Sequence, residues 1–273
     1  MKRVQALWAI FLFWAVGFAQ AGGFLEIRPS VVEISATPGK TVKGYLSLRN
    51  PRAESLRVGI EVQDGWVTQI GKPSPVPPSE WLTLKIPKKL ILRPNASKRI
   101  RYKIRVPPHL EGEALALVFF SGPPERGPGG NMGIQLRHGI PIYLSAKGTE
   151  RVELTPSAEK AFMPTPGGLE LAVTLVSHGN THVRPKGEWV ITDFFGGETE
   201  RIPLEYGTPV FPGARQEFFA RSKRPDWAPG EYKAHLTATY GDSFGPLQTM
   251  SKSFSLNVTA EKVKLTETPA PLN

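Results

Sequence analysis

The sequence predicts an all-β protein made of two tandem immunoglobulin-like β-sandwich domains. In many short segments the apolar residues recur at every second position, and turn residues separate one segment from the next. The chain contains 27 glycines and 27 prolines, residues that end strands and form turns. No stretch combines helical apolar spacing with caps. Half-buried antiparallel strands that must cover one another's apolar faces favour a sandwich.

Three segments show this alternation in the first half of the chain. Residues 56–62 place apolar side chains between polar ones, and residues 99–106 alternate basic with apolar side chains. The segment 129–145 alternates as well but carries Pro141 near its middle. Proline cannot donate a hydrogen bond to a neighbouring strand, so we expect this strand at a sheet edge or at a bulge.

The second half repeats the pattern in residues 169–175 and 232–238. A longer internal repeat accompanies it. The interval from Pro94 to Gly112 equals that from Pro212 to Gly230, 18 residues each (112−94 and 230−212). In both cases a turn precedes an alternating strand, and a Pro/Gly-rich turn leads into the next strand. Equal spacing of this kind favours two related domains in tandem.

The start of the chain has the features of an export signal. Two basic residues precede an apolar run over residues 4–18, and Ala19-Gln20-Ala21 supplies a small-x-small cleavage site. We therefore expect a periplasmic or secreted product that meets the membrane only through this signal. The expected division is a signal peptide at 1–21, a first domain at 22–148, a second sandwich at 149–262 and a flexible tail at 263–273.

Composition narrows the chemistry. The chain has no cysteine, which excludes disulfides, thiol catalysis and cysteine-ligated metals, so each domain must be stabilised by its core alone. Lys and Arg number 34 against 24 Asp and Glu, a net charge of +10. Because the basic residues are spread over many segments without a basic block, we interpret the surplus as a solvated surface and expect no nucleic-acid partner.

Two patterns resemble reactive sites but lack the required context. Residues 241–245 read Gly-Asp-Ser-Phe-Gly, the pattern of a serine nucleophile, yet strands are expected on both sides and the pattern requires a strand-to-helix turn; a hairpin is the better interpretation. His178 and His182 flank a Gly-Asn turn, where four-residue spacing does not bring two metal ligands together. We therefore expect no enzyme activity, no metal and no cofactor.

The order of segments in the first domain carries a family resemblance. Residues 27–34 open the domain, 44–51 and 56–62 follow, and a turn with an alternating strand at 94–104 precedes a long loop at 121–131. This order resembles the amino-terminal immunoglobulin-like domain of PapD-like periplasmic pilus-assembly chaperones. The second domain resembles that family only as another sandwich.

The resemblance implies a protein client, a pilin-like or surface subunit. In that family the last strand of the first domain adds itself to the open sheet of an incomplete subunit, so that backbone amides give affinity and alternate side chains fill pockets. The matching positions form the expected client-binding edge strand: Met132, Ile134, Leu136 and Ile140.

The basic anchors for a client's carboxyl end are not matched. By alignment these two positions hold Val31 and Pro141, so carboxylate anchoring is not carried over to this chain. Arg28 and Arg137 lie nearby and are the candidate anion contacts.

Two interpretations of the edge strand stay open at this point. Met132, Ile134 and Leu136 either face a client or point into the core of their own domain, because alternation suits both. The first predicts a chaperone-like protein that binds pilus or surface subunits by strand addition. The alternative is a structural or adhesive cell-envelope module that binds a polymer or a neighbouring protein.

Overall fold

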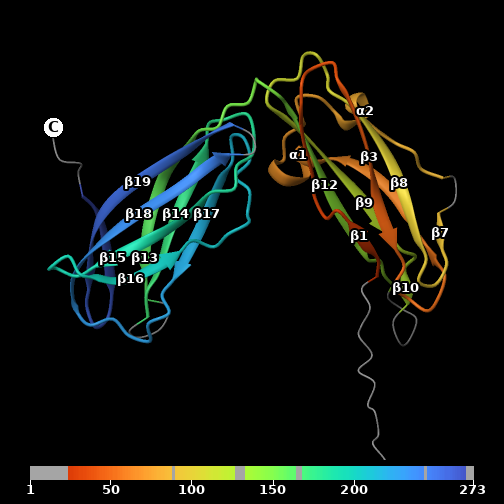
Figure 1. Ribbon diagram of the computed structural model, residues 1–273. Helices are drawn as coiled ribbons and strands as arrows, with labels where there is room; N and C mark the ends of the chain where they lie inside the picture. The colour runs from red at the N-terminus through yellow and green to blue at the C-terminus, as the bar shows by residue number, and fades with distance from the viewer. Residues whose placement is uncertain (1–23, 88–89, 127–132, 164–167, 243–244, 269–273) are drawn as a thin grey trace, which may run out of the picture.

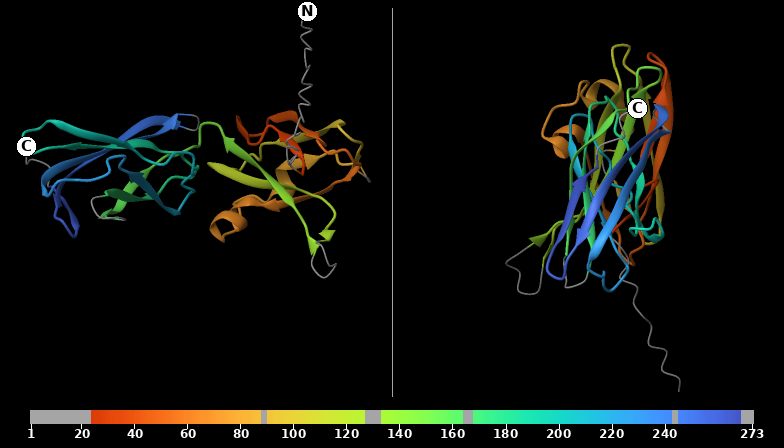
Figure 2. Two further views of the ribbon diagram at one scale, coloured as in Figure 1. Left: turned by 90° about the horizontal axis from the view of Figure 1, so that it is seen from below. Right: turned by 90° about the vertical axis from the view of Figure 1, so that its left-hand side faces the viewer.

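The computed structural model describes residues 24–87, 90–126, 133–163, 168–242 and 245–268. The expected signal peptide at 1–21 lies outside the described residues. Figure 1 shows two β-sandwiches joined by a single connection, and Figure 2 shows the same pair from two further directions. The predicted fold class, all-β with two tandem sandwiches, is confirmed.

The first sandwich consists of two four-stranded sheets. One has the strand order β1 (Glu26–Arg28), β3 (Thr41–Arg49), β8 (Ser97–Arg105), β6 (Leu82–Leu84). The other has the order β2 (Val32–Ala36), β12 (Arg137–Ala146), β9 (Glu113–Ser121), β5 (Gly59–Asp64). The chain passes from the first sheet to the second between β1 and β2, so that β2 joins β12 in parallel while the other pairs are antiparallel.

Short elements complete the first domain at its ends. Two two-stranded ribbons pair β4 (Leu56–Arg57) with β7 (Ile91–Leu92) and β10 (Glu125–Arg126) with β11 (Gly133–Ile134). Two short helices are present, α1 (Gly65–Ile70) and α2 (Pro78–Trp81). The Asp64 side chain caps α1 by accepting a hydrogen bond from the backbone N–H of Trp66 at 2.9 Å.

The second sandwich has a three-stranded and a five-stranded sheet. The smaller has the order β13 (Leu154–Phe162), β14 (Glu170–Ser177), β17 (Arg215–Arg221). The larger has the order β16 (Glu198–Pro203), β15 (Lys186–Thr192), β18 (Gly230–Asp242), β19 (Gly245–Val258), β20 (Val263–Glu267). The expected flexible tail at 263–273 is therefore wrong for residues 263–267, which pair with β19 and extend the sheet by one strand.

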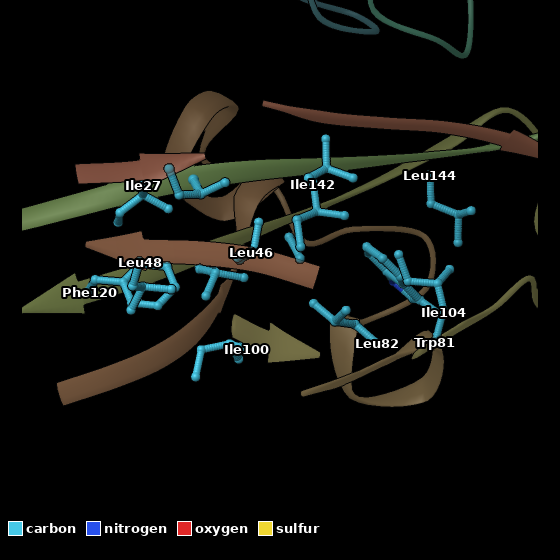
Figure 3. Packing of buried hydrophobic residues seen from close by; sticks show 14 of the residues in the cluster. Ile27, Leu46, Leu48, Trp81, Leu82, Ile100, Ile104, Phe120, Ile142 and Leu144 are labelled. Carbon is cyan, nitrogen blue, oxygen red and sulfur yellow. The ribbon is translucent and has the colours of Figure 1, made fainter. Parts of the chain in front are cut away.

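Each sandwich has its own apolar core, built by strand alternation. In the first domain Leu46 and Leu48 of β3 and Ile142 and Leu144 of β12 belong to one buried cluster between the sheets, shown in Figure 3, and all four are fully buried. In the second domain Trp189 occupies the corresponding interior. Burying one such side chain contributes roughly 1.5–3 kcal/mol to folding, so each core can stabilise its own domain without disulfides.

The internal repeat corresponds to equivalent strands in the two domains. The turn after Pro94 leads into β8 and the turn after Pro212 leads into β17; Asn95 and Gly213 adopt positive φ angles of 56° and 68° there. Gly112 and Gly230 then stand at the starts of the long strands β9 and β18. Each repeat unit is thus one pair of consecutive strands with its turns.

Candidate functional site

The amino-terminal half of β12 forms an open sheet edge. On one side all of β12 from Arg137 to Ser145 pairs with β9, and Pro141 lies opposite Leu117. On the other side the pairing with β2 begins only at Ile142, opposite Val32. Among the described residues, 137–141 therefore have a strand neighbour on one side only. Pro141 lies at this edge, where the sequence predicted it.

The two apolar side chains that precede this edge are exposed to solvent. Ile134 is 61% exposed and Leu136 is 47% exposed. The backbone N–H of Gly122 donates to the Leu136 carbonyl at 3.3 Å, and the Gln135 side chain donates to the Gly122 carbonyl at 2.9 Å, which holds this segment beside the end of β9. Met132 lies outside the described residues.

The backbone of Ile140 lies in this open edge, but its side chain does not point toward a client. Its side chain is 0% exposed and packs in the core of the first domain. Ile134, Leu136 and Ile140 are separated by even numbers of residues, so alternation predicts the same side for all three side chains. Only the Ile140 side chain is covered by the opposite sheet. The same alternating pattern therefore covers an exposed segment, residues 134–136, and a buried position, Ile140.

The two candidate anion contacts are not brought together into one site. Arg137 Nη2 lies 2.8 Å from Glu61 Oε2 on β5, and its guanidinium stacks on the Phe119 ring at 4.3 Å from the centroid. Arg28 lies on β1 in the opposite sheet, paired with Ser47. Arg137 is therefore already paired with a carboxylate, and the two arginines stand in different sheets.

A buried polar network connects the two domains. His182 Nδ1 lies 2.5 Å from Glu113 Oε2 at the start of β9, and both side chains are 0% exposed. Arg184 Nη1 lies 2.6 Å from Glu33 Oε1 on β2 and 2.6 Å from His182 Nε2. The Tyr143 ring stacks on the His182 imidazole with centroids 4.1 Å apart. Charged groups from two strands of the first domain thus meet a single loop of the second.

The ionisation of this network follows from burial and close charges. Burial raises the pKa of Glu113, and the nearby His182 offsets this only in part. Burial lowers the pKa of His182, but Glu113 and Glu33 outweigh that effect and raise it above its ordinary value. The hydrogen bond from His182 lowers the pKa of Glu33. Burial raises the pKa of the Tyr143 hydroxyl to about 12.

A cleft of about 520 Å³ lies beside this network, between the domains. Its walls combine Val31 and Glu33 of the first domain with several residues of the second: His182, Val183, Arg184, Lys186, Tyr206, Thr239, Tyr240, Gly241 and Leu247. The sequence did not single out Glu33, Glu113 or Arg184. A signal for Glu113 was present, because this carboxylate directly precedes the continuous apolar run of residues 114–120.

The two patterns that resembled reactive sites have other roles. β18 and β19 pair as an antiparallel hairpin, as predicted, with Asp242 opposite Gly245; Ser243 and Phe244 lie outside the described residues. His178 Nε2 lies 3.0 Å from the Thr155 hydroxyl, whereas His182 faces Glu113. Within the described residues no cluster of three or more metal-ligating side chains occurs.

No protein-family model matches the sequence, and no curated protein matches it. Solved structures with a similar fold include the Class 5 fimbriae chaperone CfaA, with a TM-score of 0.46 and 13% identity over 82% of this chain and 98% of that chain. A structure of the YadV chaperone has a TM-score of 0.45 and 13% identity, covering 84% and 99% of the two chains. A Salmonella enterica complex of the SafA pilin with the SafB chaperone has a TM-score of 0.43 and 15% identity, covering 86% and 96%.

All three similar structures contain chaperones, one of them a fimbriae chaperone and one solved in complex with a pilin. With identities below 25% and TM-scores below 0.5, the likeness concerns the fold and carries no argument about function. Separately, none of the helices in the described part of the chain has the length and apolar character needed to cross a bilayer.

Proposed function

We propose that this protein is an exported, non-enzymatic, chaperone-like factor that binds protein subunits by adding the open edge of β12 to a subunit's sheet. The observation that carries the proposal is the half-paired strand 137–141 preceded by the exposed Ile134 and Leu136. An edge of this kind offers unpaired backbone groups for affinity and alternate apolar side chains for pockets in the partner.

The chemistry around the edge supports a selective partner. Exposed edge strands invite aggregation, and proteins blunt them with proline and with charged side chains. Here Pro141 lies within the open edge and Arg137 begins it. Continuous pairing with a second copy is therefore impeded, while the apolar pair Ile134 and Leu136 stays available in front of the edge. The PapD-like resemblance suggests pilin-like or surface subunits as the client class.

Export is part of the proposal. It rests on the signal-like sequence at 1–21, and it places the cysteine-free sandwiches in the periplasm or outside the cell. The absence of cysteine makes the fold independent of the redox state of that compartment.

A refolding assay with a strand-deficient pilin-type subunit tests the proposal. We expect the subunit to stay soluble with equimolar wild-type protein and to aggregate without it. Hydrogen exchange should show new protection at residues 133–140 in the complex, since their edge amides gain partners. The double variant Ile134→Lys/Leu136→Lys should lose both effects.

The matched control is Phe194→Lys/Phe195→Lys, which changes two exposed apolar side chains of the second domain to the same residue. This control should protect the subunit as the wild type does. Equal protection by both double variants, or protection without slowed exchange at the β12 edge, would contradict strand addition.

A further inference from the structure

A second surface of the first domain carries a concentration of positive charge. The outward side of β8 presents four consecutive cations, because the alternate residues Ile100 and Ile104 are buried in the core. These outward residues, all exposed, are Arg99, Arg101, Lys103 and Arg105. The sequence showed the alternation, but it did not show which residues of other strands lie beside them.

The neighbouring strands add further cations to the same face. On β3, Lys43 lies opposite Lys103 and Tyr45 lies opposite Arg101. On the other side of β8, the backbone N–H of Lys85 donates to the Arg101 carbonyl at 2.8 Å, which places Lys85 beside β8 just beyond β6. In Figure 1, β3 and β8 lie side by side in the first domain.

Within the part of the chain that the structure describes, most of this charge is not neutralised. Among the described residues, the ion pair on this face joins Arg49 of β3 to Glu26 of β1 at 3.0 Å. The six other cations of the face have no carboxylate partner in the described part of the chain: Lys43, Lys85, Arg99, Arg101, Lys103 and Arg105. We define these six residues as the basic face.

The arrangement costs stability to the free protein. Lys43 and Lys103 are directly opposite each other, and like charges in cross-strand pairs are destabilising by a few tenths of a kcal/mol up to about 1 kcal/mol. An anion bound over the face would relieve that repulsion. Cations placed opposite each other on two strands give no advantage to a surface that contacts only water. On an anion-binding surface they can contact the same anion.

The spacing of the cations fits a chain of anions. Alternate residues of a strand stand about 6.6–6.8 Å apart, so Arg99 to Arg105 forms a straight row roughly 20 Å long. Arginine, which holds three of the four positions in that row, binds phosphate through paired N–H donors. The Arg99 guanidinium rests on the Tyr45 ring at 4.5 Å from its centroid, which orients it.

A hollow within the face provides a place for one anionic group. It has a volume of about 390 Å³ and is lined in part by Tyr45, Lys85, Arg99 and Arg101. The Tyr45 side chain is 47% exposed, so its ring forms an apolar floor beside the guanidinium groups.

We propose that the basic face binds a linear, phosphate-bearing polyanion laid along β8. The straight row favours an extended polymer, and the arginine content favours phosphate as its repeating group. This inference goes beyond the proposed function, since the basic face belongs to the sheet β1-β3-β8-β6 and the β12 edge belongs to the opposite sheet. A polymer and a protein client can therefore be bound at the same time.

Binding of inorganic polyphosphate, measured by calorimetry over a range of NaCl concentrations, tests the proposal. We expect the logarithm of the association constant to fall against the logarithm of the salt concentration with a slope of about −3, from roughly 0.7 per phosphate contact at four cations. The variant Arg99→Ala/Arg101→Ala should bind at least about tenfold more weakly and show a slope smaller by about 1.4. Both side chains point outward, so the fold should be kept.

The control Arg151→Ala/Arg224→Ala removes two exposed arginines of the second domain and should bind as the wild type does. Equal affinity of the two double variants would overturn the proposal, because polyphosphate binding would then depend on the net charge of the protein and not on the position of the arginines. Binding of phosphatidylglycerol vesicles in preference to polyphosphate would also overturn it, since a bilayer would then be the partner. Competition by free phosphate at the same molar phosphate concentration would exclude an extended polymer.

Discussion

His182 of the second domain and Glu113 of the first form a completely buried pair, with Nδ1 2.5 Å from Oε2. A buried carboxylate and imidazole stabilise each other, because the protein interior solvates charge poorly. The second Glu113 oxygen, Oε1, is buried without a hydrogen-bond partner among the described residues. The contact between the domains therefore depends on this single pair more than on any exposed ion pair.

Glu113→Ala should destabilise the protein by about 3–5 kcal/mol, because it removes the buried carboxylate that His182 Nδ1 contacts. Chemical denaturation followed by tryptophan fluorescence measures this loss. Glu111→Ala removes an exposed carboxylate two residues away and should change the free energy of unfolding by less than about 0.5 kcal/mol. Equal stabilities of the two variants would mean that the His182 contact does not couple the domains.

Stability should depend on pH through the same network. The raised pKa values of His182 and Glu113 mean that the folded protein holds protons more tightly there than the unfolded chain, so this stabilisation is present at acidic pH. For His182 it is complete below the ordinary value of 6.5 and is lost as the pH rises through the folded value. The lowered pKa of Glu33 acts in the opposite sense: its stabilisation is complete above the ordinary value of 4.5 and is lost as the pH falls through the lower folded value.

Thermal melts between pH 3 and 9 should therefore show a maximum near the ordinary value of 4.5 that Glu33 and Glu113 share, and a further decline above 6.5 from His182. His182→Gln removes the titrating imidazole and should flatten the decline on the alkaline side. His178→Gln, which changes an exposed histidine bonded to Thr155, serves as the control and should keep the wild-type profile. An unchanged alkaline decline in His182→Gln would assign the pH dependence to other groups.

Gly112 positions Glu113 for this contact. Its φ angle is +72°, and a Cβ atom there would lie 2.3 Å from the Asn180 carbonyl oxygen. Gly112→Ala should therefore add a clash at the domain junction to the cost of a left-handed alanine, which is roughly 1–2 kcal/mol. Gly213→Ala is the matched control, since φ is +68° there and nothing lies within 4 Å. The first variant should melt clearly below the second; similar melting temperatures would show that the junction adapts.

Ile134→Lys and Ile140→Lys should differ sharply in stability although both positions lie on one alternating segment. Ile134 is exposed, so a lysine there should change the free energy of unfolding by less than about 0.5 kcal/mol. Ile140 is fully buried, and an unpaired charge at that position should prevent the first domain from folding. Circular dichroism melts distinguish the two results. Unfolding of Ile134→Lys would mean that this side chain is covered in solution.

The strands could be predicted from sequence because alternation is a local property. Residues 99–106 and 169–175 have apolar side chains at every second position, and in the strands that they form these apolar side chains are the ones that point into the core. The point along a strand at which side chains become buried does not depend on the local sequence. Ile134 and Ile140 have the same pattern, and only the length of the opposite sheet decides which of them is covered.

Contacts between distant segments could not be predicted in the same way. Glu113 and His182 are 69 residues apart and belong to different domains, so their meeting depends on how the sandwiches join. Local alternation likewise placed four cations on one side of residues 99–105. That Lys43 lies opposite Lys103 follows only from the pairing register of β3 and β8.

Lys43→Glu should stabilise the protein while weakening its binding of polyphosphate. The change converts the repulsive pair with Lys103 into an attractive one, worth about 0.2–1 kcal/mol in a cross-strand pair. Because both side chains are exposed, the gain should shrink as salt screens it, and it should nearly disappear at 1 M NaCl. Denaturation at 20 mM and 1 M NaCl measures this difference, and Lys262→Glu, an exposed change in the second domain, serves as the control for net charge. A loss of stability at low salt in Lys43→Glu would mean that the basic face carries no repulsion for a polyanion to relieve.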